Sequence, residues 1–238
     1  MRFAFPPLTP VARAILIVLF ASFVVQSLVE GMFGIQLSEW LALHTQVGVP
    51  LAWQWATYPL VEIPGPGAVF SRGIDLLLIY AFGGYVESHL GRNRTIQLAV
   101  VSVVGGAILP LAFGLLFPTF AAPLAGGTAI TWAMLGAFAV ITRGAPVGFF
   151  LMPTMSAWYA VGVFLMITAL QSMWTRSPMP LFMAISALVA GVLFTRWLER
   201  RPLRPKKTGP GGKRPRGASH LSVIPGGQSD DDRPRWLN

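Results

Sequence analysis

Long runs of apolar residues, separated by short polar segments, fill the first 200 residues of the chain. A helix needs roughly 20 mostly apolar residues to cross a bilayer. Six runs come close to that length: 11–29, 69–86, 95–117, 125–141, 147–170 and 179–198. The pattern therefore predicts an all-α, polytopic membrane protein with six spans.

The placement of arginine predicts how these spans are oriented. With the N-terminus inside, the inner side holds Arg2, Arg13, Arg92, Arg94, Arg143 and Arg196, together with a basic tail. The outer side then holds only Arg72 and Arg176, with Glu30, Glu39 and Glu62. Since cytoplasmic loops carry the excess of Lys and Arg, this distribution favours an N-in/C-in topology. We expect a multi-pass protein of the plasma (inner) membrane.

Two segments lie outside the apolar runs. The outer segment 31–68 is rich in Trp and Pro, and Trp40, Trp53, Trp55 and Tyr58 suit the headgroup layer of a bilayer. It predicts a re-entrant or interfacial subdomain. From residue 199 onward Pro, Gly, Lys and Arg dominate, which predicts a disordered, basic cytoplasmic tail over 199–238 after a membrane domain over 1–198. We expect this tail to contact acidic lipid headgroups and not nucleic acid.

A census of reactive side chains restricts the possible chemistry. The chain has no cysteine, and its only histidines are His44, His89 and His220, none of them within a span at the depth of Thr128. A Ser or Thr nucleophile needs a base within hydrogen-bond reach, and aspartyl chemistry needs two carboxylates that share a proton. Asp75 is the only Asp outside the tail. No cluster of metal ligands is present, so neither a metal nor a cofactor is expected.

Charged residues in and near the span 69–86 need partners. A carboxylate inside a span is costly and often functional, but Arg72 lies three residues before Asp75, the spacing of a same-helix ion pair. Arg72 is also near enough to the outer end to snorkel. A structural pair and a site role for Asp75 both remain open. Glu87 is expected to cap the inner end of this span electrostatically, together with His89 and Arg92.

Four short motifs, in order along the chain, resemble those of rhomboid intramembrane serine proteases. The segment 53–57 (WQWAT) resembles the family's W-R-x-x-T, and 83–91 (GGYVESHLG) resembles G-x-x-x-E-x-x-x-G. The segment 126–129 (GGTA) lies where the family carries G-x-S-G, and 184–191 (AISALVAG) lies where it carries H-x-x-G-x-x-x-G. The resemblance extends over about residues 8–198. It implies a rhomboid-like bundle of six helices with the span 125–141 packed centrally.

Carried across residue by residue, the resemblance implies a replaced active site. The nucleophile position is Thr128, the general-base position is Ala184, and the oxyanion positions are Ser71 and Asp75. Gln54 stands in place of the motif's arginine. An ionised Asp75 would repel the negative charge that an oxyanion hole stabilises. The resemblance thus implies a catalytically degenerate pseudoprotease.

Rhomboid pseudoproteases recognise or chaperone transmembrane client proteins, and we expect clients to bind laterally through the spans 69–86 and 147–170. One alternative is an active intramembrane serine-type endopeptidase in which Thr128 works with water or an unrecognised base. Another is a small transporter with an ion or proton site at Ser71, Asp75 and Thr128, although no inverted repeat is found. A last alternative is a scaffold that acts mainly through its basic tail.

Overall fold

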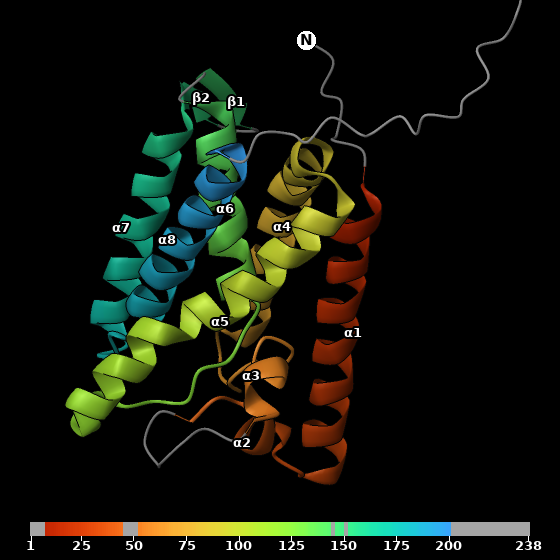
Figure 1. Ribbon diagram of the computed structural model, residues 1–238. Coiled ribbons are helices and arrows are strands. Elements are labelled where there is room, and N and C mark those ends of the chain that lie inside the picture. The colour runs from red at the N-terminus through yellow and green to blue at the C-terminus, as the bar shows by residue number, and fades with distance from the viewer. Residues whose placement is uncertain (1–7, 45–51, 144–145, 150–151, 201–238) are drawn as a thin grey trace, which may run out of the picture. The chain divides into compact units, whose positions relative to one another are not determined.

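Helices dominate the part of the chain that the computed structural model describes, which is residues 8–44, 52–143, 146–149 and 152–200 (Figure 1). The six longest are α1 (Pro10–Phe33), α4 (Ala68–Leu90), α5 (Arg92–Leu116), α6 (Thr128–Thr142), α7 (Ala157–Trp174) and α8 (Met179–Arg200). Five of them, all but α6, are long and apolar enough to cross a membrane. The chain is therefore an integral, multi-pass membrane protein. The predicted tail lies outside the described residues, apart from Glu199 and Arg200, which continue α8.

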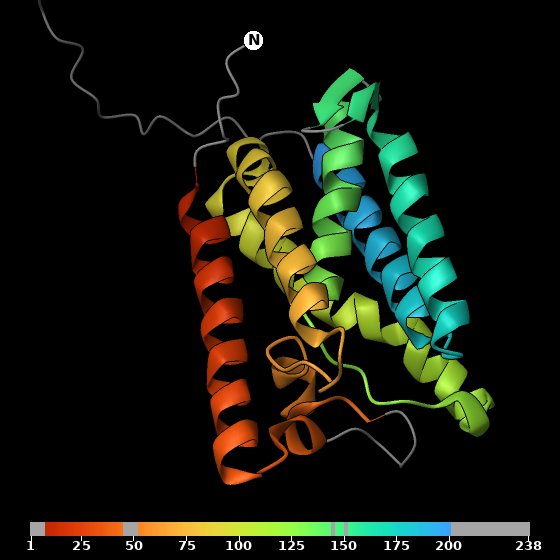
Figure 2. The same ribbon diagram turned by 180° about the vertical axis from the view of Figure 1, so that it is seen from behind.

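Helix α6 is shorter, at 15 residues, and it lies inside the bundle. Every residue from Ala129 to Ile141 is buried, and both views place α6 between α4 on one side and α7 and α8 on the other (Figures 1 and 2). A helix that is apolar all round is normally enclosed by protein. This arrangement confirms the central place expected for the span 125–141.

Small residues let α6 approach its neighbours closely. A Cβ added to Gly136 would lie 2.8 Å from the carbonyl oxygen of Leu188 in α8. A Cβ on Gly191 in α8 would collide with the backbone of Ala133. On the other side, a Cβ on Gly106 of α5 would lie 2.7 Å from the Ala129 Cβ. Because association in lipid depends on close packing and not on the hydrophobic effect, such contacts hold the bundle together.

A β-hairpin occupies the start of the predicted fifth span. Strands β1 (Pro146–Phe149) and β2 (Met152–Ser156) pair antiparallel, with Pro146 opposite Ser156. Helix α7 begins only at Ala157, so the prediction of a span over 147–170 was wrong for its first ten residues. Proline explains the difference: Pro146 and Pro153 have no N–H to donate, and each disfavours the helical region for the residue before it.

The outer segment between α1 and α4 is partly helical and is joined to the chain that leads into α6. It contains α2 (Leu37–Leu41) and α3 (Gln54–Thr57). The Thr57 hydroxyl donates to the Leu41 carbonyl at 2.9 Å, which links these two helices. Leu43 and Leu124 exchange two backbone hydrogen bonds of 2.9 Å. The outer segment is therefore fastened to the residues just before Thr128, and its position in the headgroup layer stays a prediction.

Glu87 has a different partner from the one expected. Its carboxylate accepts hydrogen bonds from the backbone N–H groups of Val11, at 2.9 and 3.1 Å, and Ala12, at 3.0 Å. These belong to the first turn of α1, where N–H groups have no partner within the helix. The prediction that Glu87 caps the end of its own helix with His89 and Arg92 was wrong. Instead, Glu87 satisfies the start of α1 and joins α1 to α4.

Candidate functional site

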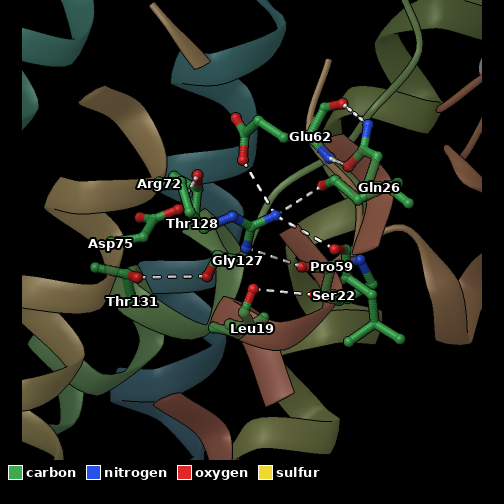
Figure 3. Close-up of polar contacts among 12 residues, drawn as sticks. Leu19, Ser22, Gln26, Pro59, Glu62, Arg72, Asp75, Gly127, Thr128 and Thr131 are labelled. Carbon is green, nitrogen blue, oxygen red and sulfur yellow. Dashed lines mark hydrogen bonds and ion pairs between the residues drawn. The ribbon is translucent and has the colours of Figure 1, made fainter. Parts of the chain in front are cut away.

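Thr128 and Asp75 form a direct hydrogen bond at the start of α6. The Thr128 hydroxyl donates to Asp75 Oδ2 at 3.0 Å (Figure 3). Thr128 is the first residue of α6, and Asp75 lies in the second turn of α4 and is 4% exposed. The contact brings together the residue that the resemblance assigns to the nucleophile and one of the two that it assigns to the oxyanion hole.

The glycines before Thr128 shape this corner. Gly126 has a φ of +104°, a conformation that residues with a Cβ rarely adopt. Its N–H donates to the Tyr58 carbonyl at 3.0 Å, so the outer segment directly contacts the turn that presents Thr128. A Cβ on Gly127 would lie 3.2 Å from Arg72 Nη1 and 3.0 Å from a methyl group of Leu19. The missing side chain at Gly127 is therefore what leaves room for the arginine.

Arg72 is buried beside Thr128 and is bound to the outer segment. Its guanidinium donates to the carbonyls of Pro59, at 3.3 Å, and Val61, at 3.0 Å, and it pairs with Glu62 at 3.2 Å (Figure 3). The residue is 1% exposed. The predictions that Arg72 snorkels to the outer surface or pairs with Asp75 were therefore wrong. Its planar fork of donors instead matches several oxygen acceptors at once.

A glutamine from α1 completes the network on the other side of Glu62. Gln26 Nε2 donates to the Glu62 carbonyl at 2.6 Å, and the Glu62 N–H donates to Gln26 Oε1 at 2.8 Å. Gln26 Nε2 also donates to Glu30 at 3.1 Å, and Glu30 accepts from the Ser38 N–H at 2.8 Å. Residues of α1, α2, the outer segment and α4 thus form one continuous set of polar contacts.

Burial changes the acid–base behaviour of the outer segment. It raises the pKa of Glu62 to about 7, against the opposing effects of the Arg72 charge and a hydrogen bond from Ser71. Ser71, the second oxyanion position, therefore contacts Glu62, whereas Asp75 contacts Thr128. Burial also raises the pKa of Tyr58, whose hydroxyl donates to the Val103 carbonyl of α5 at 2.6 Å. The raised pKa of about 7 places the titration of Glu62 near neutral pH.

The position that the resemblance assigns to the general base carries no proton acceptor. Ala184 in α8 is fully buried and ends in a methyl group. The nearest hydroxyl on the same helix, Ser186, donates to the Gly105 carbonyl and accepts from the Leu109 N–H at 3.4 Å. It is thus inserted into the hydrogen-bond ladder of α5, just before Pro110. Ser186 is engaged in packing and is not a spare nucleophile.

The remaining chemistry of the site is limited. Within the residues that the structure describes, no group of three or more His, Cys, Asp or Glu could hold a metal ion. Gln54, at the position of the motif's arginine, is 4% exposed and begins α3. The site therefore offers the Asp75 carboxylate with the hydroxyls of Thr128 and Thr131 bonded to it. Next to it lies a buried guanidinium that is turned towards the outer segment.

Two members of the network were not singled out as site residues from the sequence. Gln26 is the most polar residue of the stretch 14–29. Glu62 is the one charged residue in the stretch of apolar residues, Pro and Gly before α4. A polar group in such surroundings needs a buried partner, which is the signal that could have identified both. Their pairing with each other and with Arg72 required the fold.

Comparison with known proteins agrees with this architecture. No curated protein matches the sequence. The family model of the Rhomboid domain matches residues 51–201, a range that includes α3 to α8, the Thr128–Asp75 hydrogen bond, Arg72 and Ala184. Because this match covers more than half of the 238 residues, the chain belongs to the Rhomboid family.

Proposed function

We propose that this protein is a proteolytically inactive member of the Rhomboid family that recognises transmembrane helices of client proteins. The observation that carries the proposal is Ala184, a buried methyl group where the resemblance places the general base. The Thr128 hydroxyl is bonded to a carboxylate that would oppose an oxyanion. Losing one member of a catalytic unit costs about as much as losing all of them.

The topology that we propose has six spans in an N-in/C-in arrangement in the plasma membrane, with α6 as the fourth span. Although α6 is short, its enclosure by other helices suits a helix that does not meet lipid along its length. Arginine placement supports the orientation. In this topology the tail is cytoplasmic, where it contacts acidic lipid headgroups.

Clients are expected to dock on α4 and α7, which both pack on α6. Phe70 on α4 and Tyr159 on α7 are 74% and 72% exposed. Photo-crosslinkers at these two positions should capture membrane proteins in native cells. Ile17 on α1 is 56% exposed and provides a matched control for contact with lipid alone. Equal capture at all three positions, or none at the first two, would refute a client surface on α4 and α7.

A second candidate function is peptide hydrolysis by Thr128 with Asp75 as its base. The 3.0 Å hydrogen bond favours it, because a nucleophile and its base must lie within this reach. Thr128 Oγ1 would attack the acyl carbon while its proton passes to Asp75, and Asp75 would return that proton to the amine as the C–N bond breaks. Water would then hydrolyse the ester on Thr128 and release the acid. A fluorophosphonate probe on the purified protein decides between the two functions. The inactive protein stays unlabelled, whereas labelling that is lost in both Thr128→Ala and Asp75→Asn would establish the hydrolase.

A further inference from the structure

A groove of about 470 Å³ lies where α5, α7 and α8 meet near the 3-10 helix η1 (Pro118–Phe120). This is the end of the bundle that also carries α2 and α3 (Figure 1). Its walls are largely apolar and include Phe113, Phe120, Met173 and Leu181. Two polar residues, Ser172 and Arg176, also line it. The groove is distinct from the corner that holds Thr128.

Ser172 is unusual among the hydroxyl residues of α7. It is 7% exposed, yet its Oγ has no hydrogen-bond partner among the residues that the structure describes. Hydroxyls in helices normally donate to the carbonyl four residues earlier, and two neighbours do so: Thr168 donates to Phe164 at 3.0 Å, and Thr175 donates to Gln171 at 3.0 Å. A buried hydroxyl without a partner costs free energy. An acceptor from outside the chain, bound in the groove, would satisfy it.

Arg176 provides a charge at the same place, four residues after Ser172. It is exposed, has a φ of 52°, and makes no ion pair with any other described residue. Arg143 has a similar backbone, with a φ of 49°, but lies 3.8 Å from Glu199. Trp174, beside the groove residue Met173, is 91% exposed, as suits the interfacial layer. The groove thus combines apolar walls with an arginine side chain and a buried hydroxyl, neither of which has a polar partner within the described part of the chain.

We propose that this groove binds an anionic phospholipid. The phosphate accepts hydrogen bonds from the Arg176 guanidinium and the Ser172 hydroxyl, and an acyl chain lies along Phe113, Phe120 and Leu181. The residues that line the groove suit a ligand with one negatively charged group joined to an apolar tail. The cation provides a charge-assisted bond, and the location at the end of the spans is the depth at which headgroups lie.

The test is native mass spectrometry of the full chain in a mild non-ionic detergent, with dioleoyl phosphatidylglycerol and dioleoyl phosphatidylcholine as probes. Arg176→Gln should lose about five-fold in affinity for phosphatidylglycerol relative to phosphatidylcholine. Arg143→Gln is the control, because it removes an arginine of similar backbone outside the groove and leaves the basic tail in place. Ser172→Ala should weaken phosphatidylglycerol binding about three-fold or more.

Filling the groove tests the apolar part. Ala169→Leu places a larger side chain among the lining residues and should weaken binding of both lipids, while thermal unfolding verifies that the variant is folded. The proposal is overturned if Arg176→Gln and Arg143→Gln lose the same affinity for phosphatidylglycerol, because the preference for this lipid would then reflect a general attraction to positive charge. Unchanged affinity in Arg176→Gln or in folded Ala169→Leu would overturn it as well.

Discussion

The Arg72 guanidinium and the Glu62 carboxylate form an ion pair of 3.2 Å beside the nucleophile position of a rhomboid fold, with side chains that are 1% and 12% exposed. Through this pair the outer segment is anchored over the start of α6. Breaking one member of a buried pair leaves the other charge without compensation, which is strongly destabilising. The pair is therefore one of several polar links between the outer segment and the helices, together with the Gln26–Glu62 and Tyr58–Val103 hydrogen bonds.

Stability should depend on pH through Glu62. Its pKa is raised from 4.5 to about 7 in the folded protein, mainly by burial, so the folded state binds more protons than the unfolded state between these values. The contribution of this group is fully present below about pH 4.5 and is lost as the pH rises through about 7. Thermal unfolding in detergent should show that Tm falls as the pH rises from 5 to 8, and the fall should be smaller in Glu62→Gln. The control Glu39→Gln changes an exposed carboxylate of α2, and its Tm should fall as much as that of the unsubstituted protein.

Removing Arg72 should be costly, and less so when Glu62 is neutralised as well. Arg72→Met leaves the Glu62 carboxylate and the carbonyls of Pro59 and Val61 without their donors, so a loss of about 3–5 kcal/mol is expected. Arg72→Lys should recover only part of the stability that Arg72→Met loses, because a single ammonium group cannot reproduce the planar fork of donors in the guanidinium. A double-mutant cycle of Arg72→Met with Glu62→Gln should give a smaller loss than the sum of the two. Strict additivity would mean that the pair does not stabilise the fold.

The hydrogen bond between Thr128 and Asp75 should be structural. Thr128→Val keeps the shape but removes one of the two hydroxyls, those of Thr128 and Thr131, that bond to the buried Asp75 carboxylate. A loss of about 1–3 kcal/mol in unfolding free energy is expected. Thr142→Val is the matched control, because the Thr142 hydroxyl bonds only to carbonyls of its own helix, at 2.9 Å and 3.4 Å; its loss should be within about 0.5 kcal/mol. Equal losses would show that the Asp75 contact contributes nothing specific.

Close packing of α6 against α8 should tolerate no added methyl group at Gly191. Its Cβ would collide with the Ala133 backbone, which cannot move without shifting a helix. Gly191→Ala should therefore destabilise the protein by about 1–3 kcal/mol or more. Gly162→Ala in α7 meets nothing within 4 Å and should be neutral or slightly stabilising, since alanine favours helix. Comparable yields and Tm values for the two variants would contradict this account of the α6–α8 contact.

Much of the architecture was predictable from segments taken one at a time. The apolar runs located α1, α4, α5 and α8 closely, and the motif around Thr128 located the start of α6. The lack of a proton acceptor at position 184 was also evident, because an alanine side chain has none in any conformation. These properties belong to a residue or to a single run of residues, and they depend on no contact elsewhere.

The tertiary structure alone decided which groups bind the side chains of Arg72 and Glu87. Spacing along the helix offered Asp75 as a partner for Arg72, and Glu87 was expected to cap the end of its own helix with His89 and Arg92. The folded chain instead brings Glu62 to Arg72 and the start of α1 to Glu87. The hairpin before α7 likewise interrupts a run whose hydropathy predicts a span. A buried charge takes whichever partner satisfies the most hydrogen bonds at the lowest cost of desolvation. The choice of partner depends on which segments, distant in the sequence, meet in the fold, and the spacing of residues along one helix does not determine it.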